Sequence, residues 1–151
     1  MLPLFKNGDE KMQDIVKKIK LSKIEFEDTT DENGNVVDTQ PVQKTREYMM
    51  ILNINVIEKL EDKYASEKGS GMKNWLTRIS ESGEGQYLAL IDAICETINE
   101  GIRLENKHRK EVGLTLKERI TRDDIQLNLV EMLELITPLI KDSLDTGAEK
   151  N

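Results

Sequence analysis

Residues 125–144 read IQLNLVEMLELITPLIKDSL, and the rest of the fold has to be arranged around this stretch. At about 100° per residue, eight of its apolar side chains fall on one broad stripe of a helix. Leu127, Val130 and Leu135 lie outside that stripe and add apolar surface on other faces. Because such a helix needs neighbours on at least two sides, we expect it to be the central helix of the core.

The two ends of this helix carry different signals. Thr121 is a natural N-cap, and Asp123 and Asp124 place negative charge in the first turn, where the helix dipole favours it. Further along, Pro138 lacks a backbone donor and crowds the carbonyl of Glu134. We therefore expect a kink at Pro138, or a second short helix that begins nearby.

The composition is typical of one polar domain. The chain has 151 residues, of which 37% are hydrophobic and 34% are charged, and we expect a single domain over residues 1–144 with a disordered tail over residues 145–151. The formal net charge of −7 argues against general binding to nucleic acid or to anionic membranes. The N-terminal apolar stretch is too short for a signal peptide, and no run approaches the roughly 20 apolar residues of a membrane span. We expect a cytoplasmic protein.

The first third of the chain predicts a short helix and then a β element over about residues 20–54. The helix would open at Gly8-Asp9, with apolar side chains on one side at Met12, Ile15, Val16 and Ile19. Ile24 and Phe26 then alternate with glutamates, which is typical of a half-exposed strand.

A turn and a second strand complete this β element. Asn33-Gly34 suits a tight hairpin, and Pro41 is expected to interrupt the returning strand because proline cannot donate to a ladder. Residues 46–54 form the best strand pattern, with Tyr48, Met50, Leu52 and Ile54 on one face. Met49 and Ile51 make the other face apolar as well.

The second half of the chain predicts about four helices. Asn55 and Glu58 have the spacing of a capping box at the start of a first helix, residues 72–79 mark a short second helix, and residues 87–102 a longer third one. The polar face of the third helix is expected at Asp92, Glu96, Asn99 and Glu100. The predicted fold class is α+β, mostly α, with a small N-terminal antiparallel β-hairpin or sheet followed by a helical bundle.

No residue pattern indicates catalysis, a cofactor or a metal. The only histidine, His108, has cationic neighbours that would repel a metal ion. Cys95 falls on the apolar face of its helix, where a thiol is normally inert, so a catalytic pair with His108 is not expected. The glycine pairs at 69–71 and 83–85 lack the strand and the lysine of a phosphate loop. We expect a protein that is not an enzyme.

The connection over residues 103–122 has two interpretations. It holds seven lysines and arginines against three glutamates, so it could form a phosphate-contacting edge of a nucleic-acid-associated phage or regulatory protein. It could equally be a solvated link whose charges balance the acidic helices. We favour the second interpretation because no aromatic residue lies among the cations to stack on bases.

The order of the predicted elements resembles the tail assembly chaperones of long-tailed bacteriophages. The resemblance covers roughly residues 46–144. It rests on a β element that leads into NINVIEKLEDKY (residues 53–64), on the short and long helices near 72–79 and 86–98, and on a last helix introduced by ITRDDI (residues 120–125). The segments 28–45 and 103–119 are longer than this layout requires and stay unassigned.

The resemblance implies a binding protein of the bacterial host cytoplasm, encoded by a phage or prophage. Such chaperones coat the tape measure protein during viral tail assembly, and other tail proteins are further expected partners. The physical requirement is an apolar groove or patch that masks sticky helix surface. The partner-binding candidates are apolar residues left over after core packing, namely Met49, Ile51, Met72, Trp75, Leu127, Val130 and Leu135. A helical adaptor that forms a homo-oligomer is a further alternative.

Overall fold

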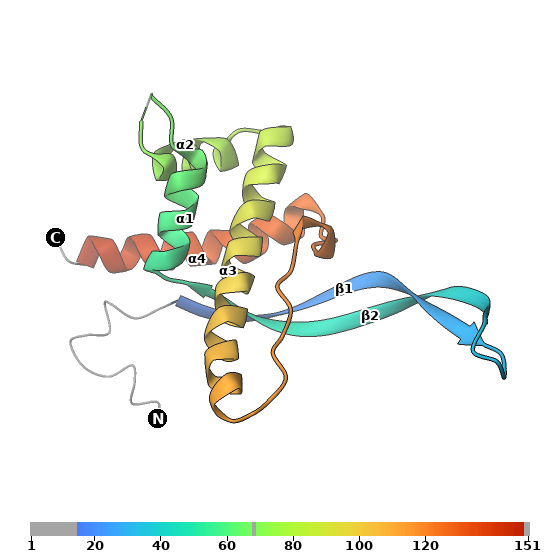
Figure 1. The fold of residues 1–151 in the computed structure, drawn as a ribbon. Helices are drawn as coiled ribbons and strands as arrows, with labels where there is room; N and C mark the ends of the chain where they lie inside the picture. Colours follow the sequence, from blue (N-terminus) through green and yellow to red (C-terminus); the bar gives the residue numbers. More distant parts are fainter. Residues whose placement is uncertain (1–14, 68, 150–151) are drawn as a thin grey trace.

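The computed structural model describes residues 15–67 and 69–149 as a long β-hairpin followed by helices (Figure 1). The elements, in chain order, are β1 (Ile15–Thr30), β2 (Val36–Leu52), α1 (Ile54–Tyr64), α2 (Gly71–Ser80), α3 (Glu84–Glu111), the 3₁₀ helix η3 (Arg122–Asp124) and α4 (Leu129–Glu149). The expected fold class, an α+β fold that is mostly α, is confirmed. In these two ranges, no helix is both long enough and apolar enough to cross a membrane.

The first strand is longer than the sequence pattern suggested. β1 pairs with β2 in a two-stranded antiparallel sheet that runs from the pair Ile15–Leu52 to the turn. The helix expected near Gly8–Ile19 is therefore wrong from Ile15 onward, and its earlier part lies outside the described residues. Ile15, Val16 and Ile19 are β-branched, which favours a strand once a partner strand is available to pair with it.

The hairpin turn lies where Asn33-Gly34 predicted it, within a five-residue loop. The carboxylate of Asp31 accepts hydrogen bonds from the backbone N–H groups of Asn33 (2.8 Å) and Asn35 (3.0 Å). Gly34 has a φ of 82°, a left-handed conformation that glycine adopts without strain. The Asp31 carboxylate therefore closes the loop from inside, and these backbone bonds lower its pKa.

The interruption expected at Pro41 is wrong, because β2 runs through this residue and Pro41 pairs with Phe26. Each strand of a two-stranded sheet keeps one unpaired edge, where a proline that lacks an N–H is tolerated. The root of the hairpin packs on the helices, where Ile19, Leu21 and Met50 are buried. Beyond the root, the hairpin projects away from the helices (Figure 1), and every side chain from Phe26 to Pro41 is exposed.

The first helix begins earlier than expected. β2 ends at Leu52 and α1 starts at Ile54, so Ile54 is helical and does not extend the strand. Asn53 is the N-cap, with its side-chain oxygen 3.2 Å from the backbone nitrogen of Val56. The expected capping box at Asn55 is wrong because Asn53 takes the same role two residues earlier.

The central helix of the fold is α3, a correction to the expectation for residues 125–144. This helix of 28 residues packs against β2, α1, α2 and α4. It approaches β2 closely at Gly101, where an added Cβ would lie 2.0 Å from the carbonyl oxygen of Met49. A glycine at this position thus lets the long helix lie directly on the strand backbone.

The last helix starts at Leu129, four residues later than expected. Thr121 does form a capping box, but with Asp124 and at the start of η3. The cap of α4 is Asn128, whose side chain accepts from the N–H of Glu131 (2.8 Å) and whose own N–H donates to the Glu131 carboxylate (3.0 Å). An extended stretch between η3 and α4 therefore divides what the periodicity presented as one helix.

The rest of α4 also differs from expectation. No second helix begins at Pro138, which lies inside α4, and the helix continues past Leu144 to Glu149. Over residues 129–141, its buried side chains form one stripe of Met132, Ile136 and Leu139. One buried stripe is typical of a helix that packs on one side of a core, so α4 flanks α3.

The basic connection is half helix and half extended chain. α3 continues to Glu111, and after Gly113 (φ 78°) the chain returns along α3 in extended form. Asn106 exchanges two hydrogen bonds with the backbone of Lys117 (2.8 and 2.9 Å). Asn99 does the same with the backbone of Ile120 (2.8 and 3.0 Å). Two asparagines of one helix therefore hold the returning segment.

Candidate functional site

An apolar cleft opens between α1, α2, α3 and α4, and we take it as the candidate binding site. Its volume is about 80 Å³, and it is lined by Leu52, Ile57, Leu60, Met72, Trp75, Leu76, Ala93, Thr97, Ile136, Leu139 and Ile140. The hydroxyl of Thr97 donates to the carbonyl of Ile94 (3.0 Å), and the indole N–H of Trp75 donates to the carbonyl of Ala89 (3.0 Å). The lining therefore presents no unpaired side-chain donor, which suits an aliphatic ligand.

The short helix α2 is fixed against α1 by hydrogen bonds at its start. Ser70 caps it by accepting from the N–H of Lys73 (3.1 Å). The carboxylate of Glu61, on α1, accepts from the N–H groups of Gly71 and Met72. Because α2 is held in this way, Met72 and Leu76 are presented at the rim of the cleft, with Leu76 37% exposed.

The structure brings two of the seven predicted partner-binding residues together. Met72 and Trp75 both line the cleft, although Trp75 is only 3% exposed and belongs to the core. Leu127 and Leu135 are half-buried and pack against the core cluster. Val130, in the first turn of α4, is 62% exposed. The cleft thus unites the α2 pair, while Leu127, Val130 and Leu135 lie outside its lining.

The other two predicted residues lie on β2. Ile51 is buried and Met49 is half-buried, so neither is a free surface residue. Three helical residues of the cleft rim were missed, namely Ile57, Leu76 and Ile140, and so was Leu52 at the end of β2. The helical spacing of the first three predicted apolar stripes. Only the packing of α1, α2 and α4 shows which members of those stripes stay accessible.

Buried charges on α3 tie the surrounding elements together. Asp92 is buried, and its carboxylate receives the hydroxyl of Tyr64 together with Lys63 (3.2 Å) and Arg122 (2.7 Å). Burial alone would raise the pKa of Asp92, but the bonds from Tyr64 and Arg122 outweigh it and leave that pKa below its usual value. The Asp92 carboxylate therefore stays ionised and joins α1 and η3 to α3.

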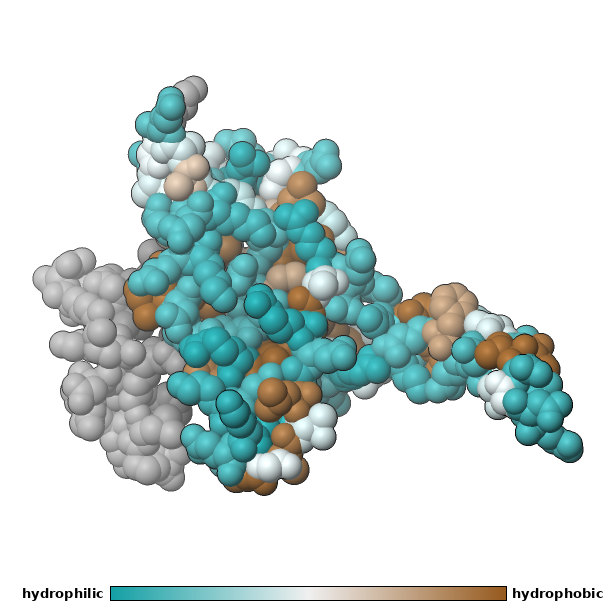
Figure 2. All heavy atoms as spheres, viewed as in Figure 1, coloured by the Kyte–Doolittle hydropathy of each residue, from teal (hydrophilic) through white to brown (hydrophobic). Residues whose placement is uncertain are grey.

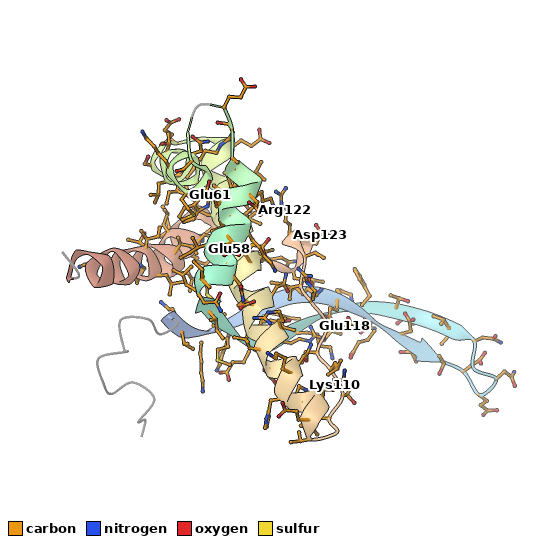
Figure 3. All side chains as sticks on the ribbon, turned by 60° about the vertical axis from the view of Figure 1, so that its left-hand side comes forward. Glu58, Glu61, Lys110, Glu118, Arg122 and Asp123 are labelled. Carbon is orange, nitrogen blue, oxygen red and sulfur yellow. The ribbon has the colours of Figure 1, made fainter. Side chains whose placement is uncertain are left out.

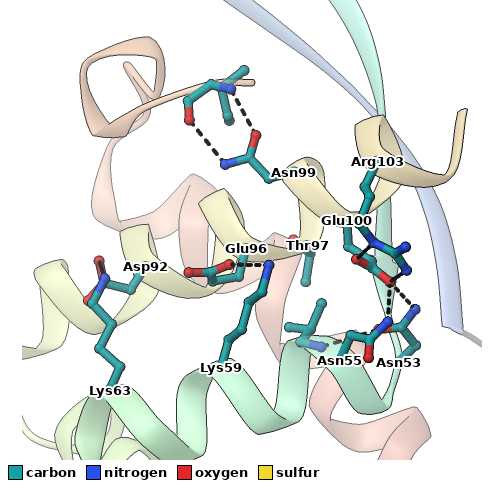
Figure 4. Close-up of polar contacts among 12 residues, drawn as sticks. Asn53, Asn55, Lys59, Lys63, Asp92, Glu96, Thr97, Asn99, Glu100 and Arg103 are labelled. Atoms are coloured by element: carbon teal, nitrogen blue, oxygen red, sulfur yellow. Dashed lines mark hydrogen bonds and ion pairs between the residues drawn. The ribbon is translucent and has the colours of Figure 1, made fainter. Parts of the chain in front are cut away.

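Glu100 forms a second buried charge cluster (Figure 4). Its carboxylate accepts from Arg103 (2.8 Å), from Asn53 (2.6 Å) and from Asn55 (3.1 Å). The bond from Arg103 dominates, and with the two asparagines it lowers the pKa of Glu100 to about 2. This cluster locks the junction between β2 and α1 onto α3. Of the polar residues predicted opposite the apolar face of α3, Asp92, Asn99 and Glu100 are therefore buried.

The two reactive side chains considered for catalysis are far apart. Both lie on α3, thirteen residues from each other, which at about 1.5 Å per residue separates them by roughly 20 Å. Burial is the main cause that raises the pKa of the Cys95 thiol, to about 11. Across the part of the chain that the structure describes, no group of three or more His, Cys, Asp or Glu side chains could hold a metal ion.

A second surface gathers part of the basic connection. A groove of about 310 Å³ is lined by Lys59, Asn99, Ile102, Arg103, Asn106, Lys107, Lys110, Leu116 and Arg119, and we call it the basic groove. We call the four helices α1–α4 the helical body. Figure 3 shows Lys110 near the end of α3, at the opposite end of the helical body from Glu61 on α1. Arg109, Lys117 and Arg122 of the same sequence segment are instead paired with Glu105 or Asp92.

Comparison of the chain with models of protein families, with curated proteins and with solved structures gives no match.

Proposed function

We propose that this protein is a non-enzymatic tail assembly chaperone of a phage or prophage, which binds the tape measure protein during tail assembly. The observation that carries the proposal is the apolar cleft between α1, α2, α3 and α4, whose side-chain polar atoms are all paired within the protein. The tape measure protein is a long helical protein, and its exposed apolar stripes would associate with each other before the tail tube covers them. It therefore needs a partner with an apolar cleft. The order of the elements over residues 46–144, which resembles that of tail assembly chaperones, also supports the proposal.

The size of the cleft sets the mode of binding. About 80 Å³ is roughly half of an engineered cavity that holds benzene, so the cleft takes one aliphatic side chain of a ligand helix. The neighbouring residues of that helix would lie on the half-buried rim, over Ile57, Met72 and Ile140. Methionine at such a rim adapts its shape to several ligands, which suits a long helical protein with many similar stripes.

Peptides that tile the tape measure protein encoded in the same genome test this proposal. Binding is measured by fluorescence anisotropy with the wild-type protein and with Leu76→Lys. A lysine at the rim places a charge over the apolar opening, so the Kd should rise about tenfold or more. The matched control is Val16→Lys, another exposed apolar residue, which lies on β1 outside the cleft lining. The proposal fails if no peptide binds, or if both variants bind like the wild type.

The basic groove supports a nucleic-acid function less well than the apolar cleft supports the chaperone function. It gathers five cationic side chains, which a phosphate backbone would match. However, no aromatic side chain lines the groove, and the chain as a whole carries a charge of −7. The groove therefore lacks the stacking surface for bases. Within the part of the chain that the structure describes, its cations Lys107, Lys110 and Arg119 have no carboxylate partner, and these three require another explanation.

A further inference from the structure

We propose that the basic groove binds the projecting half of the β-hairpin of a second copy of this chain. We call that half, residues 24–43, the arm. The arm carries six carboxylates and no lysine or arginine. Glu25 and Glu27 are paired with Arg46 and Lys44 at the root. The carboxylates nearer the turn have no cationic partner within residues 15–67 and 69–149, and these are Asp28, Asp31, Glu32 and Asp38.

The arm also exposes apolar side chains that its own chain leaves uncovered. Ile24 is 51% exposed and Phe26 is 66% exposed. The register places Phe26 opposite Pro41, and Ile24 two residues away on the same face of the sheet. Val36 and Val37, near the turn, are exposed as well. A two-stranded ribbon has no second layer to cover such a face, so this face is open to a partner.

The basic groove has the complementary character. Among the described residues, its cations Lys107, Lys110 and Arg119 have no carboxylate partner. Next to these cations, the chain after α3 exposes a short apolar strip of Val112, Leu114 and Leu116, each about half exposed. Figure 2 shows hydrophobic residues among hydrophilic ones both on the arm and at the lower end of the helical body. The arm and the basic groove thus carry opposite charges, and each has exposed apolar side chains beside its charges.

The contact has to form between copies. The base of the arm lies beside its own groove, because Glu25 and Arg119 line one pocket. Figure 1 shows the turn of the arm leading away from the C-terminal end of α3, so the carboxylates near the turn do not reach the groove of their own chain. A reciprocal exchange of arms between two copies would close a two-fold pair, whereas an arm that is not reciprocated makes a heterologous contact that leaves one arm and one groove free. Such a contact builds a ring if the rotation closes and an open chain if it does not.

A single-stranded nucleic acid is the rival occupant of the basic groove. A polyanion would match the cations, but it would leave the strip of Val112, Leu114 and Leu116 without an apolar partner. The arm supplies both kinds of surface. This proposal does not depend on tape measure binding, because the apolar cleft and the basic groove share no residue.

Light scattering of the full chain, over a series of protein and salt concentrations, tests the contact. We expect association at micromolar protein that weakens about tenfold or more between low and high salt, because exposed charges are screened. The groove variant Lys107→Glu/Lys110→Glu and the arm variant Glu32→Lys/Asp38→Lys should each abolish it. An equimolar mixture of the two variants should restore a complex. The matched control Lys73→Glu/Lys141→Glu changes the charge equally outside the groove and should still associate.

Three outcomes would overturn the proposal. The wild-type chain could stay monomeric at low salt, or it could associate equally well with either charge reversal in place. In the third outcome, a single-stranded oligonucleotide binds the wild type but not Lys107→Glu/Lys110→Glu, while no self-association occurs, and the groove then belongs to nucleic acid. Thermal melting of each variant, compared with the wild type, shows that loss of association does not come from loss of folding.

Discussion

The helical body and the arm are stabilised in opposite ways. The body buries one continuous cluster of aliphatic side chains around α3, together with the ionised carboxylates of Asp92 and Glu100. In the arm, by contrast, all side chains from Phe26 to Pro41 are exposed, and the arm is held by strand pairing, by its turn and by exposed side-chain contacts such as Thr39–Asp28 and Lys44–Glu27. Substitutions in the body should therefore change the free energy of unfolding. Substitutions in the arm should change only what the protein contacts.

The largest effect is expected for Gly101→Ala. The added methyl would lie 2.0 Å from the Met49 carbonyl oxygen, which is backbone and has no side-chain freedom to move. We expect a loss of about 3 kcal/mol or more in the free energy of unfolding, measured by urea denaturation. The matched control is Gly113→Ala, which has open space around it but a φ of 78°, so it should cost about 1 kcal/mol. Equal losses would show that α3 does not rest on the β2 backbone.

A smaller loss is expected for Glu100→Gln. The substitution removes the charge that accepts from Arg103, Asn53 and Asn55 while it keeps the shape of the side chain. We expect about 2 to 3 kcal/mol of destabilisation by urea denaturation. Glu105→Gln, which affects a more exposed pair with Arg109 and Lys117, should cost about 0.5 kcal/mol.

The pH dependence of unfolding checks the same carboxylate. The pKa of Glu100 is lowered from 4.5 to about 2 in the folded protein, so its contribution is complete above pH 4.5. That contribution is lost as the pH falls from 4.5 towards 2, because the unfolded chain then takes up the proton first. Wild-type protein should lose more stability than Glu100→Gln over this interval. Parallel curves for the two proteins would contradict the assignment.

An intermediate effect is expected where the basic connection returns along α3. Asn106→Ala removes both hydrogen bonds to the backbone of Lys117, and Lys117 then lacks a partner for its N–H and its carbonyl. We expect about 1 kcal/mol, and faster amide hydrogen exchange confined to residues 113–119. Asn128→Ala, which removes a helix cap outside this segment, is the control. Unchanged exchange in residues 113–119 would argue against the role given to Asn106.

The smallest effect on folding is expected in the arm. Phe26→Ser replaces the most exposed large apolar side chain of the described residues, so the free energy of unfolding should change by less than about 0.5 kcal/mol. If the arm docks on a neighbouring chain, the same change should weaken self-association several-fold. A large loss of thermal stability would instead mean that the arm is packed against its own chain.

Sequence patterns predicted the type of most elements in this protein. The alternation at Ile24 and Phe26, the turn at Asn33-Gly34 and the short helix with Met72 and Trp75 were all found. Period and turn chemistry are local properties, so one sequence is enough to detect them. The exceptions are residues whose secondary structure depends on a distant partner. Ile15 fits a helix or a strand by its local pattern, and its pairing with β2 makes it a strand residue.

The relative positions of the helices could not be predicted in the same way. Residues 125–144 are more apolar than α3, yet α3 lies at the centre because Gly101 lets it approach β2. The buried roles of Asp92 and Glu100 depend on partners that are distant in the chain, such as Asn53 and Arg122. Only a small part of the candidate cleft was predicted, through Met72 and Trp75. Hydrophobicity indicates which side chains are buried or bound, whereas only the packing of the helices shows which of them stay accessible.

The two asparagines that hold the returning segment also fix its length. Asn99 and Asn106 are seven residues apart on a helix, about 10 Å at about 1.5 Å per residue. Lys117 and Ile120 are three residues apart in extended chain, again about 10 Å at about 3.3 Å per residue. The two side-chain amides and the two peptide groups that they bind therefore have the same spacing. An insertion or deletion of one residue between Lys117 and Ile120 would make the two spacings unequal, so that both pairs of hydrogen bonds could not form together. This holds although the stretch is mostly exposed and looks like an ordinary loop.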